Sequence, residues 1–425
     1  MFDFFCNLRP VLTKNNCNMR RITFLLLLFC SAAMTSIGGG YQVSLHSTRY
    51  IGMGLIGTSL SYDASTIFNN PGGMSFIKDK WSFSGGASLI MARVTFQESG
   101  ENYQAHLVHE LNTPFYVYAS YKATNNLSIG LAINTPYGNR LSWGDNWQGR
   151  FLIQNLNFKA ITVQPSISYK FKDIIGIGVG LVWAYGSVDL NKALPIDYTA
   201  GESQLNIKGN TVGFGFNAGL MVHPVKGLSI GLDYRSKITM NVQNANATFT
   251  VPAALKGQFP NTQVAVALPL PANLDFGLSY EFNEKFLIGI NLCYVFWKQY
   301  DSLVFDFKTK TPSLGRTATA ALYQNRMIPR LGLQYKINPL VTVRVGGYYD
   351  PSPVQTDYLN PQTPSTNEIG LTAGLSVFPF KGFSIDAAFL YLIGMQRTGT
   401  YSPENFEGTY SSVFYIPAIG LTYSF

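Results

Sequence analysis

The sequence predicts an all-β protein, a fourteen-stranded antiparallel transmembrane β-barrel that holds an N-terminal hatch, or plug, inside its lumen. Composition is the first reason: 46% of the 425 residues are hydrophobic and 14% are aromatic, but only 13% are charged, whereas about 25% are charged in soluble domains. The second reason is a two-residue alternation of apolar with small or polar residues, which gives a strand one apolar and one polar face. The third is an alternation of short turns with long loops, which is typical of outer-membrane barrels.

Residues 1–38 are expected to lie outside the mature fold. Arg20 and Arg21 precede an apolar run at residues 22–30, and small residues follow it. This order describes a secretory signal peptide, and we expect translation to start at Met19, which makes residues 1–18 an upstream extension. The apolar run is too short to span a bilayer as a helix, which takes about 20 apolar residues. No later segment is long enough either, so only strands remain to cross a membrane.

Charge and cysteine content narrow the set of partners. The net charge is +8, of which the predicted leader holds a surplus of three, and the remaining +5 is modest for this length. No block of Lys and Arg stands out, so nucleic acid is not expected as a partner. Cys6, Cys17 and Cys30 lie in the predicted leader, which leaves Cys293 alone in the mature chain. We therefore expect no intramolecular disulfide, and we expect Cys293 to be a small apolar residue within a strand.

Short and long connections divide the rest of the chain into fourteen strands. The short connections are predicted at residues 122–126, 171–174, 224–227, 282–285, 336–340 and 379–382. The long polar ones are predicted near residues 96–103, 136–155, 191–203, 247–271, 305–316, 351–365 and 397–408. Outer-membrane barrels keep short turns in the periplasm and long loops outside, and they have an even number of strands. Both ends of the barrel are then expected on the periplasmic side.

The alternation is clearest in two strands. In the predicted fifth strand, Ile177, Val179 and Leu181 alternate with glycines. In the last strand, Leu421 and Tyr423 alternate with small or polar residues, and the strand stops at Phe425. A closing strand with a terminal aromatic residue resembles the assembly signal of outer-membrane barrels. Outer-membrane lipids and the barrel-assembly machinery are therefore expected partners.

Charged residues indicate which face of the strands looks inward. Asp233, Arg235, Asp275 and Arg344 share the small-residue face of their strands. A charge at the middle of the bilayer costs about 2–4 kcal/mol, so this face is predicted to line the lumen. The alternative is a soluble β-sandwich or propeller with chance alternation, which leaves the leader, the strand count and the terminal phenylalanine as coincidences.

Residues 39–78 differ from residues 79–425, which are predicted to form the barrel. They are rich in small residues and lack a clean alternation, and a short helix over residues 63–68 is the simplest local structure. A fourteen-stranded barrel is wide enough to leave an open lumen unless something fills it. We expect this segment to fold inside the barrel as the hatch.

Three motifs in this segment point to a known family. They are Gly40-Tyr41-Gln42-Val43, Asp63-Ala64-Ser65-Thr66 and Asn70-Pro71-Gly72. With them the chain resembles the outer-membrane transporters of long-chain fatty acids and other hydrophobic compounds, the FadL/TodX type. The family has Ala where this chain has Gly72, a departure that keeps the residue small. Further family-like motifs follow in order through the barrel, namely Thr135-Pro136-Tyr137-Gly138, Trp147-Gln148-Gly149-Arg150, Leu268-Pro269-Leu270-Pro271 and Asp350-Pro351-Ser352-Pro353-Val354.

The resemblance implies passive uptake of a fatty acid or an aromatic hydrocarbon across the outer membrane of a Gram-negative bacterium, with no cofactor. The extracellular loops would capture the ligand, a pocket beside the hatch would hold it, and a gap in the barrel wall would release it as the hatch shifts. Asn70, Pro71 and Gly72 are the expected gating residues.

Ligand-binding residues are expected in the loops and in the lumen. An apolar groove would use Trp143, Trp147, Phe151, Leu152 and Leu194. A carboxylate would favour a cation, for which the candidates are Arg150, Arg235, Arg330 and Arg344. The alternative for each arginine is a lumenal ion pair with Asp233 or Asp275.

An enzyme is not expected. No Ser–His–carboxylate set can be assembled around His46, His106, His109 and His223, and no metal site is predicted because His106 and His109 point to opposite faces of a strand. The alternatives to a selective transporter are a general porin and a surface adhesin or haem-binding barrel. A porin would have an open polar lumen, whereas this chain has a predicted plug and an aromatic external loop.

Overall fold

The computed structural model describes residues 40–108, 111–196 and 201–425. The predicted signal peptide, the start at Met19, the cysteines Cys6, Cys17 and Cys30, and His109 lie outside the described residues.

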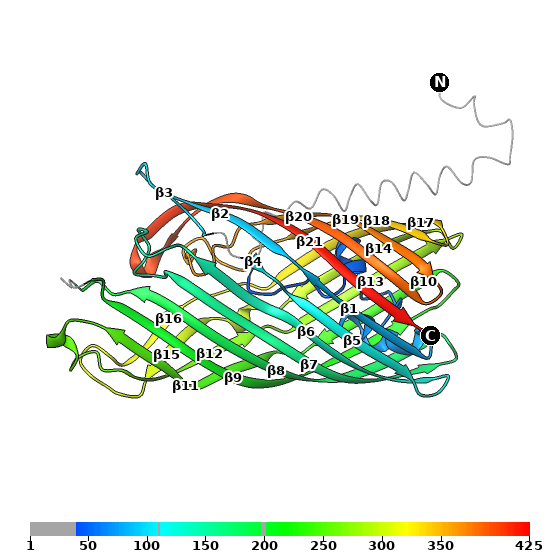
Figure 1. Cartoon of the computed structure of the whole chain (residues 1–425), viewed down its shortest axis with the longest axis horizontal. Helices are drawn as coiled ribbons and strands as arrows, with labels where there is room; N and C mark the ends of the chain where they lie inside the picture. Colours follow the sequence, from blue (N-terminus) through cyan, green and yellow to red (C-terminus); the bar gives the residue numbers. More distant parts are fainter. Residues whose placement is uncertain (1–39, 109–110, 197–200) are drawn as a thin grey trace, which may run out of the picture. The chain divides into compact units, whose positions relative to one another are not determined.

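The described residues form a closed antiparallel β-barrel of fourteen strands, as predicted (Figure 1). Several strands are interrupted, so the sheet consists of 21 hydrogen-bonded segments. The ring closes where β1 (Trp81–Ser88) pairs with β21 (Phe406–Ser424). Trp81 and Phe425 exchange two backbone hydrogen bonds at this closure, of 2.8 and 3.0 Å.

The remaining segments follow one another around the ring. Uninterrupted strands are β6 (Leu127–Ser142), β7 (Asn155–Phe171), β8 (Ile175–Ala193), β9 (Gln204–Val222), β18 (Val341–Asp350), β19 (Glu368–Phe380) and β20 (Phe383–Tyr401). Interrupted strands comprise β1 with β2 (Ile90–Glu98), β3 (Gln104–His106) and β4 (Leu111–Asn112) with β5 (Phe115–Lys122), β10 (Leu228–Arg235) with β11 (Ile238–Thr250), β12 (Thr262–Leu270) with β13 (Asn273–Phe282), β14 (Phe286–Val295) with β15 (Ser302–Phe307), and β16 (Arg316–Ala320) with β17 (Arg326–Asn338). Short 3₁₀ helices lie in two of the longer connections, at η2 (Ala253–Leu255) and η4 (Ser402–Glu404), and η3 (Trp297–Gln299) lies in the interruption between β14 and β15.

The short turns lie where the sequence predicts them. Lys172 and Asp173 join β7 to β8 with φ angles of 51° and 55°, and Asn283 and Glu284 join β13 to β14 with φ angles of 49° and 58°. Two successive residues with positive φ characterise type I′ turns, whose twist matches that of a hairpin. These tight turns gather at one end of the barrel, and the long connections gather at the other (Figure 1).

The predicted long loops are partly wrong because the strands run further than expected. β6 continues to Ser142, inside the predicted loop at residues 136–155, and β20 continues to Tyr401, inside the predicted loop at residues 397–408. Much of the predicted loop at residues 247–271 is strand β12. These extensions are polar in sequence, yet each has a neighbouring strand that continues the ladder of backbone hydrogen bonds.

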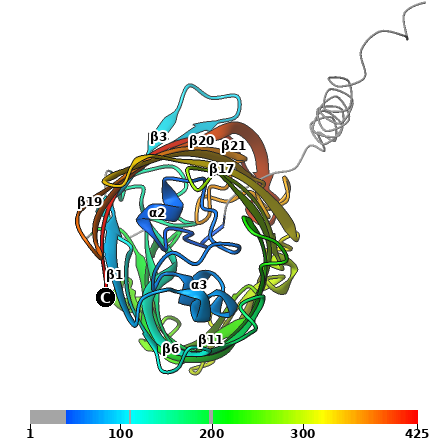
Figure 2. The ribbon, with the colours of Figure 1, turned by 90° about the vertical axis from the view of Figure 1, so that its right-hand side faces the viewer.

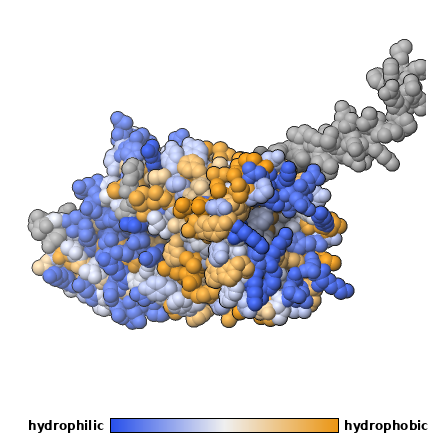
Figure 3. Space-filling model, turned by 45° about the vertical axis from the view of Figure 1, so that its right-hand side comes forward, coloured by the Kyte–Doolittle hydropathy of each residue, from blue (hydrophilic) through white to orange (hydrophobic). Residues whose placement is uncertain are grey.

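The two faces of the wall have the predicted character. On β8, Val179 and Leu181 are exposed on the outside, whereas Gly178, Gly180 and Val182 are buried inside. Apolar residues gather across the middle of the outer surface, between hydrophilic ends (Figure 3). Within the described part of the chain, no helix is both long and apolar enough to cross a membrane.

Residues 40–77, called the hatch segment below, lie inside the ring of strands (Figure 2). They contain α2 (Thr48–Ile51), α3 (Thr66–Asn69) and η1 (Pro71–Phe76). The helix predicted over residues 63–68 is misplaced: α3 starts only at Thr66, because Asp63 forms a turn in which its Oδ1 atom accepts a hydrogen bond from the backbone N–H of Ser65 at 2.9 Å.

Candidate functional site

The predicted gating motif, Asn70, Pro71 and Gly72, is buried where α3 meets η1. The Oδ1 atom of Asn70 accepts a hydrogen bond from the backbone N–H of Gly72 at 2.9 Å and so caps η1. Its Nδ2 atom donates to the carbonyl of Thr58 at 2.7 Å and to the carbonyl of Leu220 on β9 at 3.0 Å. One side chain therefore joins the motif to another part of the hatch segment and to the barrel wall.

The wall beside this motif is made of glycines. We call them the glycine platform: Gly176, Gly178, Gly219 and Gly231, from β8, β9 and β10. A Cβ atom on Gly178 would come within 2.3 Å of the carbonyl carbon of Pro71, and one on Gly231 within 1.9 Å of the carbonyl oxygen of Thr58. The hatch segment thus lies with its backbone directly against the backbone of the wall, an approach that only glycine permits.

A buried ionic cluster ties the hatch segment to another part of the wall. Arg49 of α2 lies 2.9 Å from the Asp63 carboxylate and 3.0 Å from that of Asp386 on β20, and it also donates to the hydroxyl of Ser384. All three charged side chains are at least nine-tenths buried. Removing one partner from a buried ion pair leaves an uncompensated charge, so the cluster strongly favours the docked arrangement.

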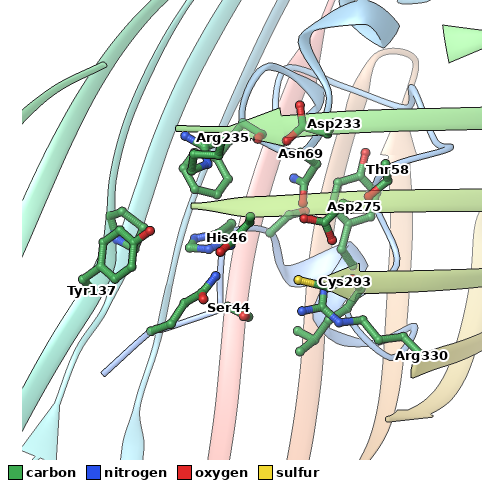
Figure 4. A pocket seen from close by; sticks show the side chains of 17 residues that line it. Ser44, His46, Thr58, Asn69, Tyr137, Asp233, Arg235, Asp275, Cys293 and Arg330 are labelled. Carbon is green, nitrogen blue, oxygen red and sulfur yellow. Dashed lines mark hydrogen bonds between the residues drawn. The ribbon is translucent and has the colours of Figure 1, made fainter. Parts of the chain in front are cut away.

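A polar pocket lies between the hatch segment and β10, β13, β14 and β17 (Figure 4). Asp233 is paired in register with Asp275, and Asp275 with Cys293, so these three side chains form one row across adjacent strands. Arg235 and Arg330 also line the pocket. Two carboxylates and two guanidinium groups therefore share one buried space.

The two arginines of this pocket differ in how fully they are engaged. Arg235 donates to Gln164 Oε1 at 2.9 Å and to the carbonyl of Phe68 at 2.6 Å, and its guanidinium lies 3.8 Å from the centre of the Phe68 ring. Arg330 donates through Nη1 to the carbonyl of Leu55 at 3.1 Å. Its Nε atom is buried and has no hydrogen-bond partner among the described residues. Arg330 therefore has a donor available for a ligand.

His46 of the hatch segment also lines the pocket and lies against the Phe68 ring, with 4.1 Å between ring centres. Burial, together with the positive charges of Arg235 and Arg330, lowers the pKa of His46 well below its ordinary value of 6.5. The imidazole is therefore neutral at neutral pH, and the positive charge of the pocket resides on the arginines.

Two cavities flank residues 40–45 of the hatch segment. The first, the mixed cavity, measures about 230 Å³ and has polar as well as apolar walls; its lining includes Val43, Leu45, Leu107, Arg140, Ile328, Arg330, Tyr348, Asp350, Glu368 and Leu392. The second, the apolar cavity, measures about 100 Å³ and is lined mainly by Tyr41, Leu156, Phe158, Val188, Leu190, Ile207, Met240, Val242, Val266, Leu268, Tyr300, Leu303 and Phe305. Arg330 borders both the mixed cavity and the polar pocket.

Tyr41 orders the aromatic wall of the apolar cavity. Its ring centre lies 5.9 Å from Phe158, 5.9 Å from Tyr300 and 4.9 Å from Trp297, each in an edge-to-face arrangement. Its hydroxyl donates to the carbonyl of Pro269. Sequence reasoning did not identify these residues as ligand-binding, although the Gly40-Tyr41 motif was the signal that could have led to them.

The predicted loop residues occupy different surroundings. Trp143 and Trp147 are buried and stacked with 4.8 Å between ring centres, and their Nε1 atoms donate to the carbonyls of Pro361 and Ile153. Phe151 is partly exposed, and Arg150 lies over its ring while pairing with Glu202 at 2.8 Å. Leu152, Leu194 and these four residues border neither of the two cavities, so their role in ligand capture stays a prediction.

Arg344 lies apart from the cavities as well. It is buried, and it donates to Gln334 Oε1 at 2.8 Å and to Ser376 Oγ at 2.5 Å. Of the predicted arginines, Arg235 and Arg330 are brought together, whereas Arg150 and Arg344 are not. Among the residues that the structure covers, no cluster of His, Cys, Asp and Glu could hold a metal ion, and Cys293 is a buried free thiol.

Comparison with known proteins identifies relatives over the whole barrel. Residues 29–425 match the family described as "Outer membrane protein transport protein (OMPP1/FadL/TodX)". The long-chain fatty acid transport protein of Escherichia coli strain K12 is 23% identical over 87% of this chain and 91% of its own length.

Solved structures share the fold. A FadL homologue from Pseudomonas aeruginosa superimposes with a TM-score of 0.81 at 18% identity, covering 91% of this chain and 100% of its own. The toluene transporter TodX of Pseudomonas putida gives a TM-score of 0.70 at 15% identity, covering 91% of this chain and 99% of its own. Because the family match extends over nearly all of the sequence, this chain belongs to the OMPP1/FadL/TodX family of Gram-negative outer-membrane transport proteins, which carry hydrophobic compounds and are not enzymes.

Proposed function

We propose that this protein takes up amphipathic carboxylates, with long-chain fatty acids as the favoured class, and that the hatch segment gates their release. The observation that carries the proposal is the position of Arg330. It borders the mixed cavity with an unpaired buried Nε donor, next to apolar residues that include Ile328 and Leu392. A charged donor beside an apolar space suits a molecule with an anionic head and a hydrocarbon tail.

The apolar cavity suits the tail or a single aromatic ring. A dry cavity of about 150 Å³ binds benzene in another protein, and the apolar cavity is close to that size at about 100 Å³. Each methylene group buried there contributes about 0.8 kcal/mol. Uptake therefore needs no reaction and no energy source at the site. Toluene-like compounds, which a structural relative carries by its name, would use the apolar cavity without Arg330.

Release would follow the seam between β5 and β6. Their pairing stops at Tyr116 opposite Asn134, and the chain of β6 then contains Pro136, which has no N–H to donate. Beyond this point β6 bonds to the hatch segment: the N–H of Val43 donates to Pro136 at 2.9 Å, and the N–H of Gly138 donates to Tyr41 at 3.0 Å. A shift of the hatch segment would free this part of β6 and open the wall beside the mixed cavity.

Two sets of variants test the two proposed binding sites separately: the apolar cavity for the hydrocarbon tail, and Arg330 for the carboxylate head group. Leu268→Trp would fill the apolar cavity, whereas Ala267→Trp changes the neighbouring residue, which faces outward on the same strand. We expect Leu268→Trp to lose binding of both oleate and toluene and Ala267→Trp to retain it, as measured with the purified protein in detergent.

Arg330→Met tests the head site. Loss of a hydrogen bond to a charged group costs about 1.5–3 kcal/mol, so oleate should bind about 10- to 100-fold more weakly, while toluene binding stays unchanged. Equal weakening of both ligands would contradict the carboxylate role. If the parent protein binds and imports no hydrophobic compound while sugars pass freely, the porin alternative is correct.

A further inference from the structure

A second seam interrupts the wall, between β9 and β11. The ladder of β9 with β10 ends at Asn217 opposite Arg235, and its ladder with β11 resumes only at Lys208 opposite Asn246. Residues 209–216 of β9 are paired with β8 throughout. On the other side they have no register partners among the described residues, although Phe216 accepts a backbone hydrogen bond from Ser236 at 2.9 Å and donates one to its hydroxyl at 2.8 Å. We call the stretch between them and residues 236–245 the β9–β11 seam.

The reason for the seam is a change of phase along the chain. Arg235 and Ile238 both point inward although they are three positions apart, whereas a regular strand repeats every two residues. A bulge between Val242 and Ala245 restores the phase. Between these two irregularities, inward-pointing residues of β11 lie opposite outward-pointing residues of β9. The two strands therefore cannot form a regular ladder there.

Side chains close the inner face of the seam. Gly213 and Gly215 of β9 present no side chain there. The space is occupied by Ile238, which lies against both glycines, and by Met240, which lies against Gly213. A Cβ atom on Gly213 would come within 2.6 Å of Ile238 Cγ2 and within 2.9 Å of Met240 Sδ. Met240 also crosses β9 to reach Gly186 of β8. The side chains that close the seam are thus partly flexible, because methionine has three rotatable bonds.

The seam adjoins the apolar cavity. Met240, Val242 and Thr211 line that cavity and belong to the seam as well. On the outside, Val212, Phe214 and Phe216 are exposed, and Phe214 is 73% exposed. Lys237 and Asn241 across the seam are exposed and polar. Apolar and polar groups meet here as they do at the boundary between lipid tails and head groups.

We propose that the β9–β11 seam is a second lateral port, through which an amphipathic anion enters the apolar cavity directly from the outer leaflet. Its tail passes between β9 and β11 when Ile238 and Met240 move aside, and its head group stays with Lys237 at the interface until the tail is bound. This port admits ligand already dissolved in the membrane, whereas the extracellular loops admit ligand from water. The inference rests on the proposed function, because it supplies the same cavity.

A disulfide across the seam tests the port. A Cβ atom on Gly213 would lie 2.6 Å from Ile238 Cγ2, so Gly213→Cys with Ile238→Cys, in a Cys293→Ala background, places two inward-facing thiols side by side across the seam. Lys208→Cys with Asn246→Cys is the matched control, since it links the same strands at a regular pair. Proteoliposomes are loaded with a fluorescent fatty acid in the membrane, and the rate of its transfer to the protein is measured before and after reduction.

We expect the oxidised Gly213/Ile238 pair to lose transfer from the membrane and to regain it on reduction, with the oxidised control unaffected. Ile238→Ala should have the opposite effect and speed transfer, because it removes part of the side-chain packing that closes the seam. Equal rates for the oxidised and reduced seam pair, or no acceleration in Ile238→Ala, would overturn the port. If the parent binds the fatty acid from water but these variants do not differ, only the port fails; if the parent binds none, the proposed function fails.

Discussion

The hatch segment meets the wall in two contrasting ways. Toward the short turns, it lies backbone to backbone on the glycine platform and is tied down by Arg49, with no room for a ligand in these contacts. Toward the long loops, residues 40–45 run between the mixed cavity and the apolar cavity. The lumen is therefore tightly packed at the end with the short turns and contains cavities at the end with the long loops.

The largest effect is expected from breaking the closed end at Arg49. Arg49→Met would leave Asp63 and Asp386 buried without their cation, which costs about 3–5 kcal/mol. We expect the hatch segment to detach from β20 and the barrel to conduct ions, as measured by single-channel conductance in planar bilayers.

Lys226→Met is the matched control for this charge. Lys226 pairs with Glu284, and both side chains are more than three-quarters exposed. An exposed pair contributes at most about 1 kcal/mol, so conductance should stay at the parent level. A closed Arg49→Met barrel would show that the ionic cluster does not hold the hatch segment.

A smaller effect is expected from adding one carbon atom to the glycine platform. Gly231→Ala would place a Cβ atom 1.9 Å from the carbonyl oxygen of Thr58, and forced packing of this kind costs about 1–3 kcal/mol. Gly85→Ala is the control, because its Cβ atom would lie 3.6 Å from the nearest atom. We expect faster protease cleavage of the hatch segment in Gly231→Ala alone. Equal cleavage of the two variants would mean that close packing against the glycine platform does not hold the hatch segment in place.

The smallest effect is expected at Asn70. Asn70→Ala removes the cap of η1 together with the bonds to Thr58 and Leu220, and loss of a cap costs about 0.5–2 kcal/mol. The barrel should assemble normally and show heat-modifiable mobility on gels, but uptake of labelled oleate by cells should fall. Uptake at the parent rate would contradict the gating role of the motif.

Much of the barrel could be predicted from the sequence, because a strand between lipid and lumen shows its two faces in a two-residue pattern. The inward direction of Asp233 and Asp275 follows from that pattern. The fourteen strands and the turns at residues 172–173 and 283–284 follow from the alternation of short and long connections. The ends of strands such as β6 and β20 could not be predicted from these patterns, because polar residues outside the bilayer can either continue a strand or form a loop.

The site was harder to predict because it depends on which strands come together. Arg235 and Arg344 have similar places in the sequence pattern, yet only Arg235 reaches the polar pocket, whereas Arg344 bonds to Gln334 and Ser376. Trp143 and Trp147 suggest an apolar groove, but their rings stack on each other in the interior. The sequence pattern predicts whether a side chain points into the lumen or out of it. Which side chains it contacts there depends on how the strands are arranged in the closed barrel.

The closure of the ring also constrains how the molecule is made. β21 pairs with β20 along one edge and with β1 and β2 along the other. Until β21 is in place, both neighbouring edges present unpaired backbone groups that invite association with other chains. The hatch segment precedes every strand in the chain and contacts β9 as well as β20. We therefore expect the hatch segment to be seated, or to be enclosed at that moment, when β21 completes the ring, so that insertion of the last strand is the step that encloses it.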